Sequence, residues 1–471
     1  MSKFYITTTL PYVNGKPHIG FALEAVQADV IARFERLRGK DVIFNIGTDE
    51  HGAKIYEKAK EEGITPQEYC DRMSKPFRAL RETLDIHFTN FIRTTDEFHV
   101  RAAQEFWKRC ADRGDIYKKN YRMKYCVGCE LEKTDSDLVD GRCPEHPNRD
   151  LETVEEENYF FRFSHYRAAL LRLYENDPKF VVPEKRLNEI VAFVDRGLHD
   201  FSVSRLAQKM PWGIPVPGDE AHVMYVWFDA LVNYISTLGW PEDMDSFEKF
   251  WPGIQIAGKD NLRQQSAMWQ AMLLSAGIEP SRKILIHGHV MSAGQKMSKS
   301  LGNVVSPDEL IETFGIDGTR YLLLSAAPFG EDMDITKERM IEKYNADLAN
   351  GLGNLVSRVM KLAEGMEEKY VPHVREFPNE FVSSFESYRL TEALDFVWSL
   401  VRRANKNIEE TKPWELKKTD YESFERVLQE LLFDIETIAF LLGPFLPHTS
   451  EKIFSFFSSE GGRSVLFERI R

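Results

Sequence analysis

The sequence predicts an α/β protein whose parallel sheet is interrupted by an insertion and followed by an all-helical domain. Three observations predict this class: a strand–helix–strand pattern at the start of the chain, strand-like segments that return after a polar stretch, and a helix-compatible remainder beyond Lys337. We therefore assign the two halves of the sheet to residues 1–115 and 224–336, the insertion to residues 116–223 and the helical domain to residues 337–471.

The first half of the sheet begins with KFYITTTL at residues 3–10, whose β-branched and aromatic residues are typical of a strand. From Ile19 to Leu37 apolar residues recur mostly every three or four positions, which predicts an amphipathic helix that ends before Gly39. DVIFNIG at residues 41–47 then predicts a buried strand. Such a β-α-β unit is the building block of a parallel sheet.

The insertion, from Ile116 to Val223, is rich in short polar stretches and carries a cysteine cluster and the acidic run ETVEEENYFFRF. After it the sheet is expected to resume with three strands. These are HVMYVWF at residues 222–228, GIQIAG at 253–258 and KILIHGHV at 283–290, with a helix at 262–277 between the last two.

The composition limits the possible functions. The chain has 471 residues, of which 43% are hydrophobic, and its net charge of -13 argues against nonspecific nucleic-acid binding but leaves a local basic patch open. An apolar run of about 18 residues is absent, and so is an export signal, so we expect a cytoplasmic protein that does not enter a membrane. Five cysteines in such a chain disfavour a disulfide framework.

Two loops that follow predicted strands are candidates for binding phosphate. In PHIG, His18 lies at the start of the first helix, where backbone N–H groups and the helix dipole favour an anion and Gly20 permits a close approach. The alternative is a histidine that merely caps the helix. In GQKMSKSLGN, residues 294–303, Lys296 and Lys299 can neutralise a triphosphate, and the alternative is an ordinary solvated loop.

Several motifs occur in an order that identifies a family. PHIGF and KMSKS are similar to the paired signatures of class I aminoacyl-tRNA synthetases. Together with TTTLPYVNGKPHIG, GTDEHG, EEENYFFR, YVWFDALVNYIS, AGKD, HGHV and GQKMSKSLGN, they closely resemble the methionyl-tRNA synthetase family from near the start of the chain to its helical end. The resemblance implies a Rossmann-type catalytic domain, split by a zinc-binding connective insertion, and an α-helical bundle that binds the anticodon of tRNA(Met).

The implied reaction joins L-methionine to ATP, giving methionyl-adenylate and pyrophosphate, and then transfers the amino acid to the terminal ribose of tRNA(Met). Magnesium is expected to accompany the ATP. The implied catalytic residues are His18, Lys296 and Lys299. The implied ATP-binding residues are Pro11, Asn14, Gly15, His18, Gly20, Phe21, Lys296, Met297, Ser298, Lys299 and Ser300.

The chain departs from the family motif at one position, because the motif usually ends in a second histidine and this chain has Phe21. A phenyl ring cannot donate a hydrogen bond to phosphate. We still expect a working enzyme, since the histidine at position 18 and both lysines remain. We also expect that Phe21→His does not slow adenylate formation in a pyrophosphate-exchange assay, and a slower variant would contradict this account of position 21.

The amino-acid pocket is expected to have aromatic walls, because methionine is flexible and its polarisable sulfur makes favourable contacts with rings. Asp49 is implied to pair with the ammonium group of the substrate. For each aromatic residue taken alone, packing in the core is the alternative. The implied pocket consists of Leu10, Tyr12, Asp49, Trp227, Ala230, Leu231, Tyr234 and His287.

A cysteine cluster in the insertion has the spacing of a structural zinc site, C-x2-C followed by C-x2-H, which can supply four tetrahedral ligands. The alternative is a set of reduced cysteines without metal, and in related synthetases a fourth cysteine often takes the place of the histidine. Cys70 and Cys110 lie in helical stretches and are expected to be buried. The candidate ligands are Cys126, Cys129, Cys143 and His146.

In the C-terminal domain two long amphipathic stretches, residues 393–410 and 424–443, predict packed helices. Asn354 and Arg358 are four positions apart on one helical face, and Trp414 follows in a separate segment. Single-stranded bases are bound by stacking on aromatic rings and by hydrogen bonds to their edges. The resemblance implies that these three residues contact the CAU anticodon, and the alternative for the tryptophan is packing in the core or a loop.

Three other readings stay open. A class I synthetase for cysteine fits the length, whereas those for leucine, isoleucine and valine carry an editing domain for which the insertion is too short. A noncatalytic tRNA-binding relative is a second reading, suggested by Phe21 alone. A zinc-dependent hydrolase is disfavoured, because four soft ligands would fill the metal's coordination shell. We expect a monomer with tRNA(Met), ATP and L-methionine as partners.

Overall fold

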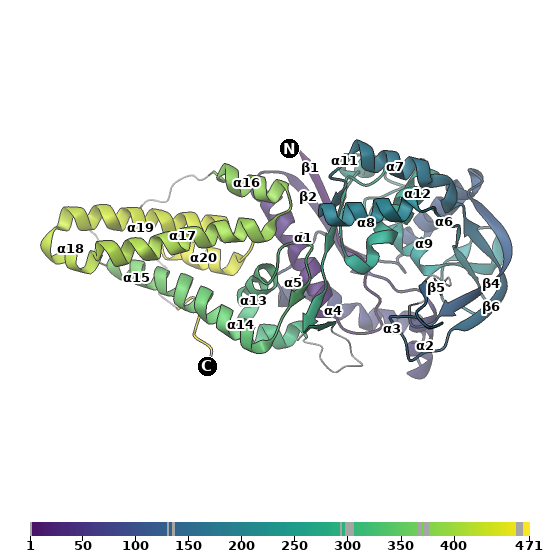
Figure 1. Cartoon of the computed structure of the whole chain (residues 1–471), viewed down its shortest axis with the longest axis horizontal. Helices are drawn as coiled ribbons and strands as arrows, with labels where there is room; N and C mark the ends of the chain where they lie inside the picture. The colour runs from purple at the N-terminus through teal and green to yellow at the C-terminus, as the bar shows by residue number, and fades with distance from the viewer. Residues whose placement is uncertain are drawn as a thin grey trace.

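The computed structural model describes residues 2–129, 131–133, 137–292, 294–296, 306–364, 370, 376–457 and 465–471. Within these residues, a parallel sheet with helices on both faces lies between an antiparallel region at one end of the molecule and a helical bundle at the other (Figure 1). The predicted α/β class, with an insertion and an all-helical C-terminal part, is confirmed.

The central sheet is parallel throughout and is built from segments far apart in the chain. Its spatial order is β3 (Asn90–Arg93), β2 (Asp41–Thr48), β1 (Lys3–Thr7), β12 (Ile254–Gly258), β13 (Lys283–His287) and β7 (Val181–Val182). β2, the next strand in the chain, pairs with one edge of β1, and β12, which comes much later in the chain, pairs with the other edge. The carboxyl ends of β1 and β12 therefore flank the topological switch point, where open α/β sheets bind ligands.

The helices that accompany this sheet vary in length, and a π-helix, η4, directly precedes α12. They are α1 (Ile19–Leu37), α2 (Ala53–Glu61), α3 (Pro66–Met73), α4 (Lys75–Arg78), α5 (Leu80–Thr83), α6 (Glu97–Asp112), α7 (Arg167–Asn176), α8 (Glu184–Asp195), α9 (Val226–Leu231), α10 (Asn233–Ser236), α11 (Met244–Phe250), η4 (Gln264–Met268), α12 (Trp269–Ser275) and α13 (Pro307–Ser325).

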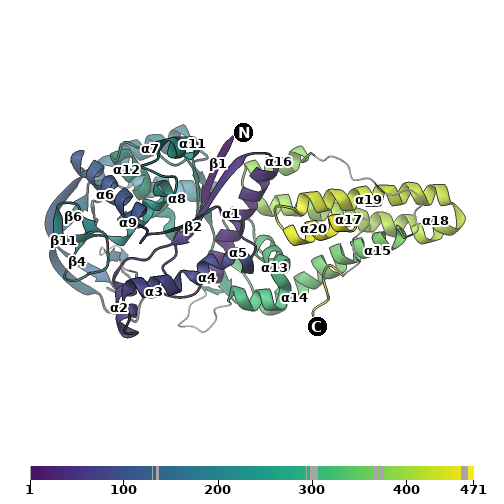
Figure 2. The same ribbon diagram turned by 180° about the vertical axis from the view of Figure 1, so that it is seen from behind.

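Two hydrophobic cores lie on the two faces of the sheet. Successive side chains of a strand point to opposite faces, and in β1 Phe4 and Ile6 join a core with α1 and α13, whereas Tyr5 joins a core with α6, α8 and α12. Figures 1 and 2 show α1 and α13 on the side of the sheet that faces the bundle. The buried strand thus serves both cores, which explains its nearly continuous apolar pattern.

Residues 116–223 fold largely as antiparallel structure. Two small sheets have the orders β5 (Leu131–Lys133), β4 (Ile116–Cys126), β6 (Glu152–Phe161), β8 (Phe201–Ser202), and β10 (Pro215–Val216), β11 (Asp219–Met224), β9 (Ser204–Leu206). The same range also contains β7, which pairs with β13 in the central sheet. The domain limits drawn from the sequence stay a prediction, and they did not anticipate this strand.

The strand expected at HVMYVWF is wrong in two respects. β11 ends at Met224 and α9 begins at Val226, so the second half of the segment is helical. β11 also pairs with β9 and β10 and not with the central sheet. β-branched and aromatic residues favour strands only weakly, and burial of Val226 and Phe228 in a helix outweighs that preference.

The C-terminal part is helical, as predicted, and forms an elongated bundle (Figure 1). A small sheet of β14 (Val290–Ser292), β15 (Gln295–Lys296) and β16 (Met333–Asp334) precedes it. The bundle comprises α14 (Lys337–Lys343), the π-helix η6 (Tyr344–Gly353), α15 (Asn354–Leu362), α16 (Asn379–Glu386), α17 (Leu390–Thr411), α18 (Pro413–Thr419), α19 (Tyr421–Leu442) and α20 (Pro447–Ser455). Among the described helices, none is long and apolar enough to cross a membrane.

A buried arginine joins the helical bundle to the part of the chain that contains the parallel sheet. Arg320 of α13 and its partner Asp29 of α1 are both fully buried. Burial alone would raise the pKa of Asp29, but the guanidinium groups of Arg320 and Arg33 outweigh this effect and lower it. All five N–H donors of the Arg320 guanidinium are used, one by the carboxylate of Asp29 (2.7 Å) and four by the backbone carbonyls of Leu84, Asp85, Pro444 and Phe445.

Candidate active site

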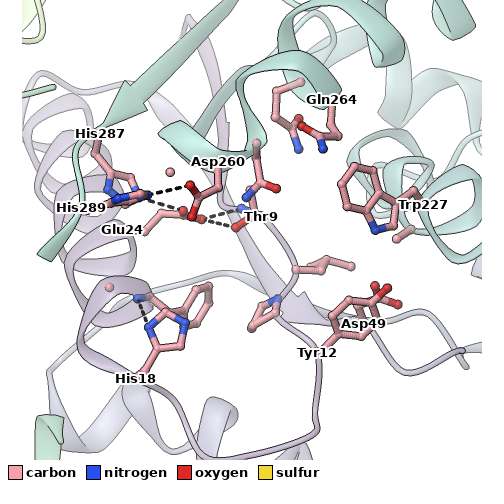
Figure 3. Close-up of a pocket in the computed structure, with 18 of the residues that line it drawn as sticks. Thr9, Tyr12, His18, Glu24, Asp49, Trp227, Asp260, Gln264, His287 and His289 are labelled. Carbon is pink, nitrogen blue, oxygen red and sulfur yellow. Dashed lines mark hydrogen bonds and ion pairs between the residues drawn. The ribbon is translucent and has the colours of Figure 1, made fainter. Parts of the chain in front are cut away.

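A cavity of about 510 Å³ opens at the switch point of the sheet, beyond the carboxyl ends of β1, β12 and β13 (Figure 3). Residues at or after the ends of four strands, β1, β2, β12 and β13, and residues of α1, α9, α10 and η4 supply its walls. The lining residues are Thr9, Leu10, Pro11, Tyr12, His18, Ile19, Gly20, Phe21, Glu24, Asp49, Trp227, Ala230, Leu231, Asn233, Tyr234, Gly258, Asp260, Asn261, Gln264, Gln265, His287, Gly288, His289 and Val290.

His18 caps α1 and also lines this cavity. Its Nδ1 accepts a hydrogen bond from the backbone N–H of Phe21 at 3.2 Å, as the capping alternative supposed. Because Nδ1 acts as an acceptor, the proton of the neutral imidazole lies on Nε2, which makes Nε2 a hydrogen-bond donor. The capping bond at Nδ1 is therefore compatible with a phosphate contact through Nε2–H, and that contact stays a prediction.

The two residues after Ile19 in this motif, Gly20 and Phe21, bring no polar side-chain group to the cavity wall. A Cβ atom at Gly20 would lie 3.1 Å from Nδ1 and Cε1 of His18, so glycine leaves room for the capping ring. Phe21 is only 4% exposed, and its ring packs edge-on against Phe77 with centroids 5.8 Å apart. Phe21 thus contributes packing to the cavity wall where a second histidine would supply a donor.

A buried acidic side chain, Glu24, connects the walls of the cavity. Its carboxylate accepts hydrogen bonds from the backbone N–H (2.7 Å) and the hydroxyl (2.6 Å) of Thr9, and it lies 3.0 Å from Nε2 of His287 (Figure 3). Nδ1 of His287 lies 2.8 Å from the carbonyl oxygen of Gly288, so this nitrogen carries a proton. Glu24 thereby ties α1 to the ends of β1 and β13.

All eight residues that the sequence implied for methionine line this one cavity, although they come from four separate parts of the chain. Trp227, Ala230 and Leu231 lie on α9, and Tyr234 lies on α10. The loops that carry Tyr12 and Asp49 are joined by backbone hydrogen bonds, from Asp49 N to Pro11 O (2.9 Å) and from Val13 N to Asp49 O (3.3 Å). Asp49 is 3% exposed. The substrate-binding role of these residues stays a prediction.

The structure brings only some of the implied ATP-binding residues into the cavity wall. Pro11, His18, Gly20 and Phe21 line it, but the described lining residues do not include Asn14 and Gly15. The backbone of Lys296 ends β15, and its side chain lies outside the described part of the structure. Met297, Ser298, Lys299 and Ser300 lie outside the described residues.

Sequence reasoning missed several polar residues of the cavity. Asp260 lies 2.7 Å from Nε2 of His289, and Nε2 of Gln265 donates to the hydroxyl of Tyr234 at 2.8 Å. Burial, and to a lesser extent the carboxylate of Glu24, raises the pKa of Tyr234, which keeps the phenol protonated. The signal for these residues was the motif AGKD and the carboxamides that follow it, together with the carboxylate of Glu24 within an apolar helix.

A second site lies in the antiparallel region. The four predicted ligands offer sulfur and nitrogen atoms that all lie within 4.8 Å of one another. Tetrahedral zinc with these donors would hold neighbouring ligand atoms about 3.5–3.8 Å apart, and the observed separations, 3.2, 3.4 and 3.9 Å, lie near this range. The set could therefore hold a metal ion. Its members are Cys126, Cys129, Cys143 and His146.

Two features around this cluster favour the observed arrangement. A Cβ atom at Gly128 would lie 2.5 Å from the ring of His146, so the knuckle between the first two cysteines has to be glycine. Nζ of Lys54 on α2 donates to the carbonyl of Gly128 at 2.9 Å. This bond joins the knuckle to a helix of the part that contains the parallel sheet. Outside the cluster, Cys70 and Cys110 are buried as expected, and burial raises the pKa of the Cys110 thiol to about 12.

Two of the three implied anticodon residues lie against each other. The guanidinium carbon of Arg358 is 5.9 Å from the ring centroid of Trp414, within the range of a cation–π contact. Trp414 is 43% exposed, which disfavours the core-packing alternative. Asn354 is exposed at the start of α15, one turn before Arg358. Trp414 belongs to α18, at the end of the bundle far from the central sheet (Figure 1).

Comparison with known proteins identifies the family of the chain. The profile of a family described as tRNA synthetases class I (M) matches residues 4–152 and 147–360. The fold and the cavity thus define the class of the protein, the class I tRNA synthetases.

Individual relatives narrow the class. A methionine–tRNA ligase from Caldanaerobacter subterraneus subsp. tengcongensis is 42% identical over 469 residues, covering 96% of this chain and 73% of the relative. One from Brucella suis is also 42% identical over 469 residues and is covered to 91%. The solved structure of Mycobacterium tuberculosis methionyl-tRNA synthetase in complex with methionyl-adenylate matches with a TM-score of 0.89 and 38% identity, covering 97% of this chain and 94% of that chain. The chain belongs to the methionine–tRNA ligase family.

Proposed function

We propose that this chain activates L-methionine with ATP to methionyl-adenylate and transfers the methionine to the 3′ end of tRNA(Met). The observation that carries the proposal is the single cavity at the switch point, where the eight implied methionine residues meet the cap of α1. Membership in the methionine–tRNA ligase family supports the same reaction. We further propose that the protein works as a cytoplasmic monomer.

In the proposed reaction Asp49 binds the ammonium group of methionine, and the aromatic walls enclose its side chain. The carboxylate of methionine attacks the α-phosphorus of ATP, a new C–O–P bond forms, and the bond to pyrophosphate breaks. Nε2–H of His18 and the start of α1 donate to the phosphates as charge develops. Lys296 and Lys299 are proposed to neutralise the leaving pyrophosphate, and magnesium enters with the ATP.

Pyrophosphate exchange with each of the twenty amino acids tests this proposal. Methionine should support exchange at least about tenfold better than any other amino acid, the discrimination expected from one mismatched group in a pocket. Exchange with none of them would remove the enzymatic reading. Preference for cysteine would favour the main rival, although no cysteine occurs among the described residues that line the cavity.

We propose zinc as the ion of the Cys3His cluster, because thiolate and imidazole ligands in a closed tetrahedron suit zinc and leave no open position for catalysis. Its role is to hold the antiparallel region together. Cys126→Ser should lose the bound zinc, about one equivalent per chain in the parent protein, as measured by elemental analysis of the purified proteins. Cys110→Ser, which removes a buried cysteine outside the cluster, should keep it. Parent protein that is purified in the presence of zinc and still lacks it would contradict the assignment.

We propose that Arg358, Trp414 and Asn354 contact the anticodon, supported by the exposure of Trp414 and its contact with Arg358. Trp414→Ala should lower kcat/KM for tRNA(Met) charging about 5- to 150-fold, the loss of one base–aromatic stack. Pyrophosphate exchange, which needs no anticodon, should stay the same. Tyr421→Ala, which removes another exposed aromatic ring of the bundle, is the matched control. Equal losses in both variants would contradict a specific contact.

A further inference from the structure

Three segments from different parts of the fold meet at the side chain of Arg320: α1, α13 and the turn between α19 and α20. Asp29 belongs to α1, the helix capped by His18 at the cavity. Arg320 itself belongs to α13, the helix that follows the KMSKS sequence in the chain. The carbonyl groups of Pro444 and Phe445 belong to the turn between α19 and α20 of the bundle. We refer to these contacts, with those to Leu84 and Asp85, as the Arg320 joint.

The joint tolerates little change in its geometry. A buried charge is stable only when its partner and its hydrogen bonds are all in place, and Arg320 and Asp29 are both fully buried. Because the five donors of a guanidinium group are fixed in one plane, they specify the positions of five acceptors at the same time. Movement of the α19–α20 turn against α1 would leave at least one buried charge or carbonyl without its bond.

Small rotations at this joint become large displacements at the far end of the bundle. α17 and α19 have 22 residues each, so each is about 33 Å long. A rotation of about 5° at one end of such a helix moves the other end by about 3 Å. Trp414, in α18 at that far end, would move by this amount relative to the cavity (Figure 1).

We propose that Arg320 is a positioning residue for tRNA charging, which holds the bundle against α1 and α13 so that anticodon contacts at the far end place the 3′ end of tRNA at the adenylate. The inference rests on the proposed function, because it concerns a tRNA bound at both places. A misplacement of about 1 Å between reacting groups can cost about 100-fold in rate. Adenylate formation is expected to depend on the cavity and not on the position of the bundle, because the residues proposed to bind methionine all line the cavity.

Arg320→Lys tests the inference, since lysine keeps the charge but offers only three donors, which have no fixed plane. The assays are pyrophosphate exchange and the charging of two transcripts, tRNA(Met) and tRNA(Met) with a changed anticodon. The variant should lower kcat for charging tRNA(Met) about 10- to 100-fold, with less than about a threefold change in KM for tRNA or in exchange. Its preference for the correct anticodon should fall by about the same factor as kcat, because anticodon contacts then no longer contribute to the transition state.

Arg33→Lys is the matched control. Arg33 also donates to the carboxylate of Asp29 (2.7 Å) and to the carbonyl of Asp85 (2.6 Å). Among the described residues, both of these partners precede the helical bundle in the chain and belong to the part that contains the parallel sheet. Arg33→Lys should leave the anticodon preference unchanged. If Arg320→Lys does not fold, Asp317→Asn weakens the same connection, since the carboxylate of Asp317 accepts from the backbone N–H of Thr449 on α20 at 2.6 Å. This variant should also lower the preference.

Two results would overturn the inference: an anticodon preference that is the same in the joint variants and the parent protein, or exchange and charging that fall by the same factor. The second result would mean that the joint only stabilises the fold. Failure of the proposed function has a different outcome, because the parent protein itself would then show no methionine-dependent exchange and no charging.

Discussion

Asp49→Asn is expected to reduce kcat/KM for methionine in pyrophosphate exchange about 100- to 1,000-fold. Asp49 is almost fully buried in the cavity wall, and its backbone is fixed by hydrogen bonds to Pro11 and Val13. Truncating one partner of a buried, hydrogen-bonded charge pair costs about 3 to 4 kcal/mol, which corresponds to this factor. Asparagine keeps the shape of the side chain, so the loss would report the charge on the ammonium group.

The KM for ATP provides the internal control for this variant. It should change by less than about threefold, because the proposed phosphate contacts come from His18 and the start of α1 and do not involve Asp49. An equal rise in KM for both substrates would show instead that the substitution distorts the cavity. A variant with parental kcat/KM for methionine would rule out Asp49 as the ammonium ligand.

Gly288→Ala is expected to slow adenylate formation about 100-fold. A Cβ atom at this position would lie 2.1 Å from the carbonyl oxygen of Glu331 and 2.6 Å from the backbone N of Asp332, and neither backbone atom can rotate away. β14, which follows Gly288, would therefore have to shift by about 1 Å relative to β16, a displacement that can cost this factor in rate. The shift would also carry β15 and the KMSKS sequence that begins there.

The rate of methionyl-adenylate formation in a single turnover measures this effect, and Ser292→Ala on the same strand is the control, because it removes an atom and adds none. The control should react within about twofold of the parent protein, as surface substitutions usually do. Parental rates for Gly288→Ala would mean that the β14–β16 contact does not influence adenylate formation.

The fold could be predicted from the sequence wherever a segment was long and regular. α1 follows from its apolar spacing, β1 follows from its β-branched and aromatic residues, and β2, β12 and β13 follow from short apolar runs. β7 could not be predicted, because two residues show no period. The segment after Met224 was misassigned for a related reason, since buried aromatic and β-branched residues occur in helices as well as strands.

The site could be predicted where a motif determined it, and less well where distant contacts determine it. The aromatic residues of the cavity lie in motifs, so the resemblance identified them. Glu24 connects the walls of the cavity only because Thr9, after β1, and His287, at the end of β13, both contact its carboxylate. These two residues come from different halves of the split sheet. Gln265 likewise depends on Tyr234. A single sequence does not contain these pairings, because they arise from packing.

The split sheet has a consequence for synthesis on the ribosome. β1 pairs with β12, which is made about 250 residues later, and at about 5–20 residues per second this delay is about 12 to 50 seconds. During that time the backbone groups on one edge of β1 have no native neighbour in the sheet. The antiparallel region with its cysteine cluster is complete earlier in the chain. We expect it to fold first, before β12 can pair with β1 and β13 can complete the parallel sheet.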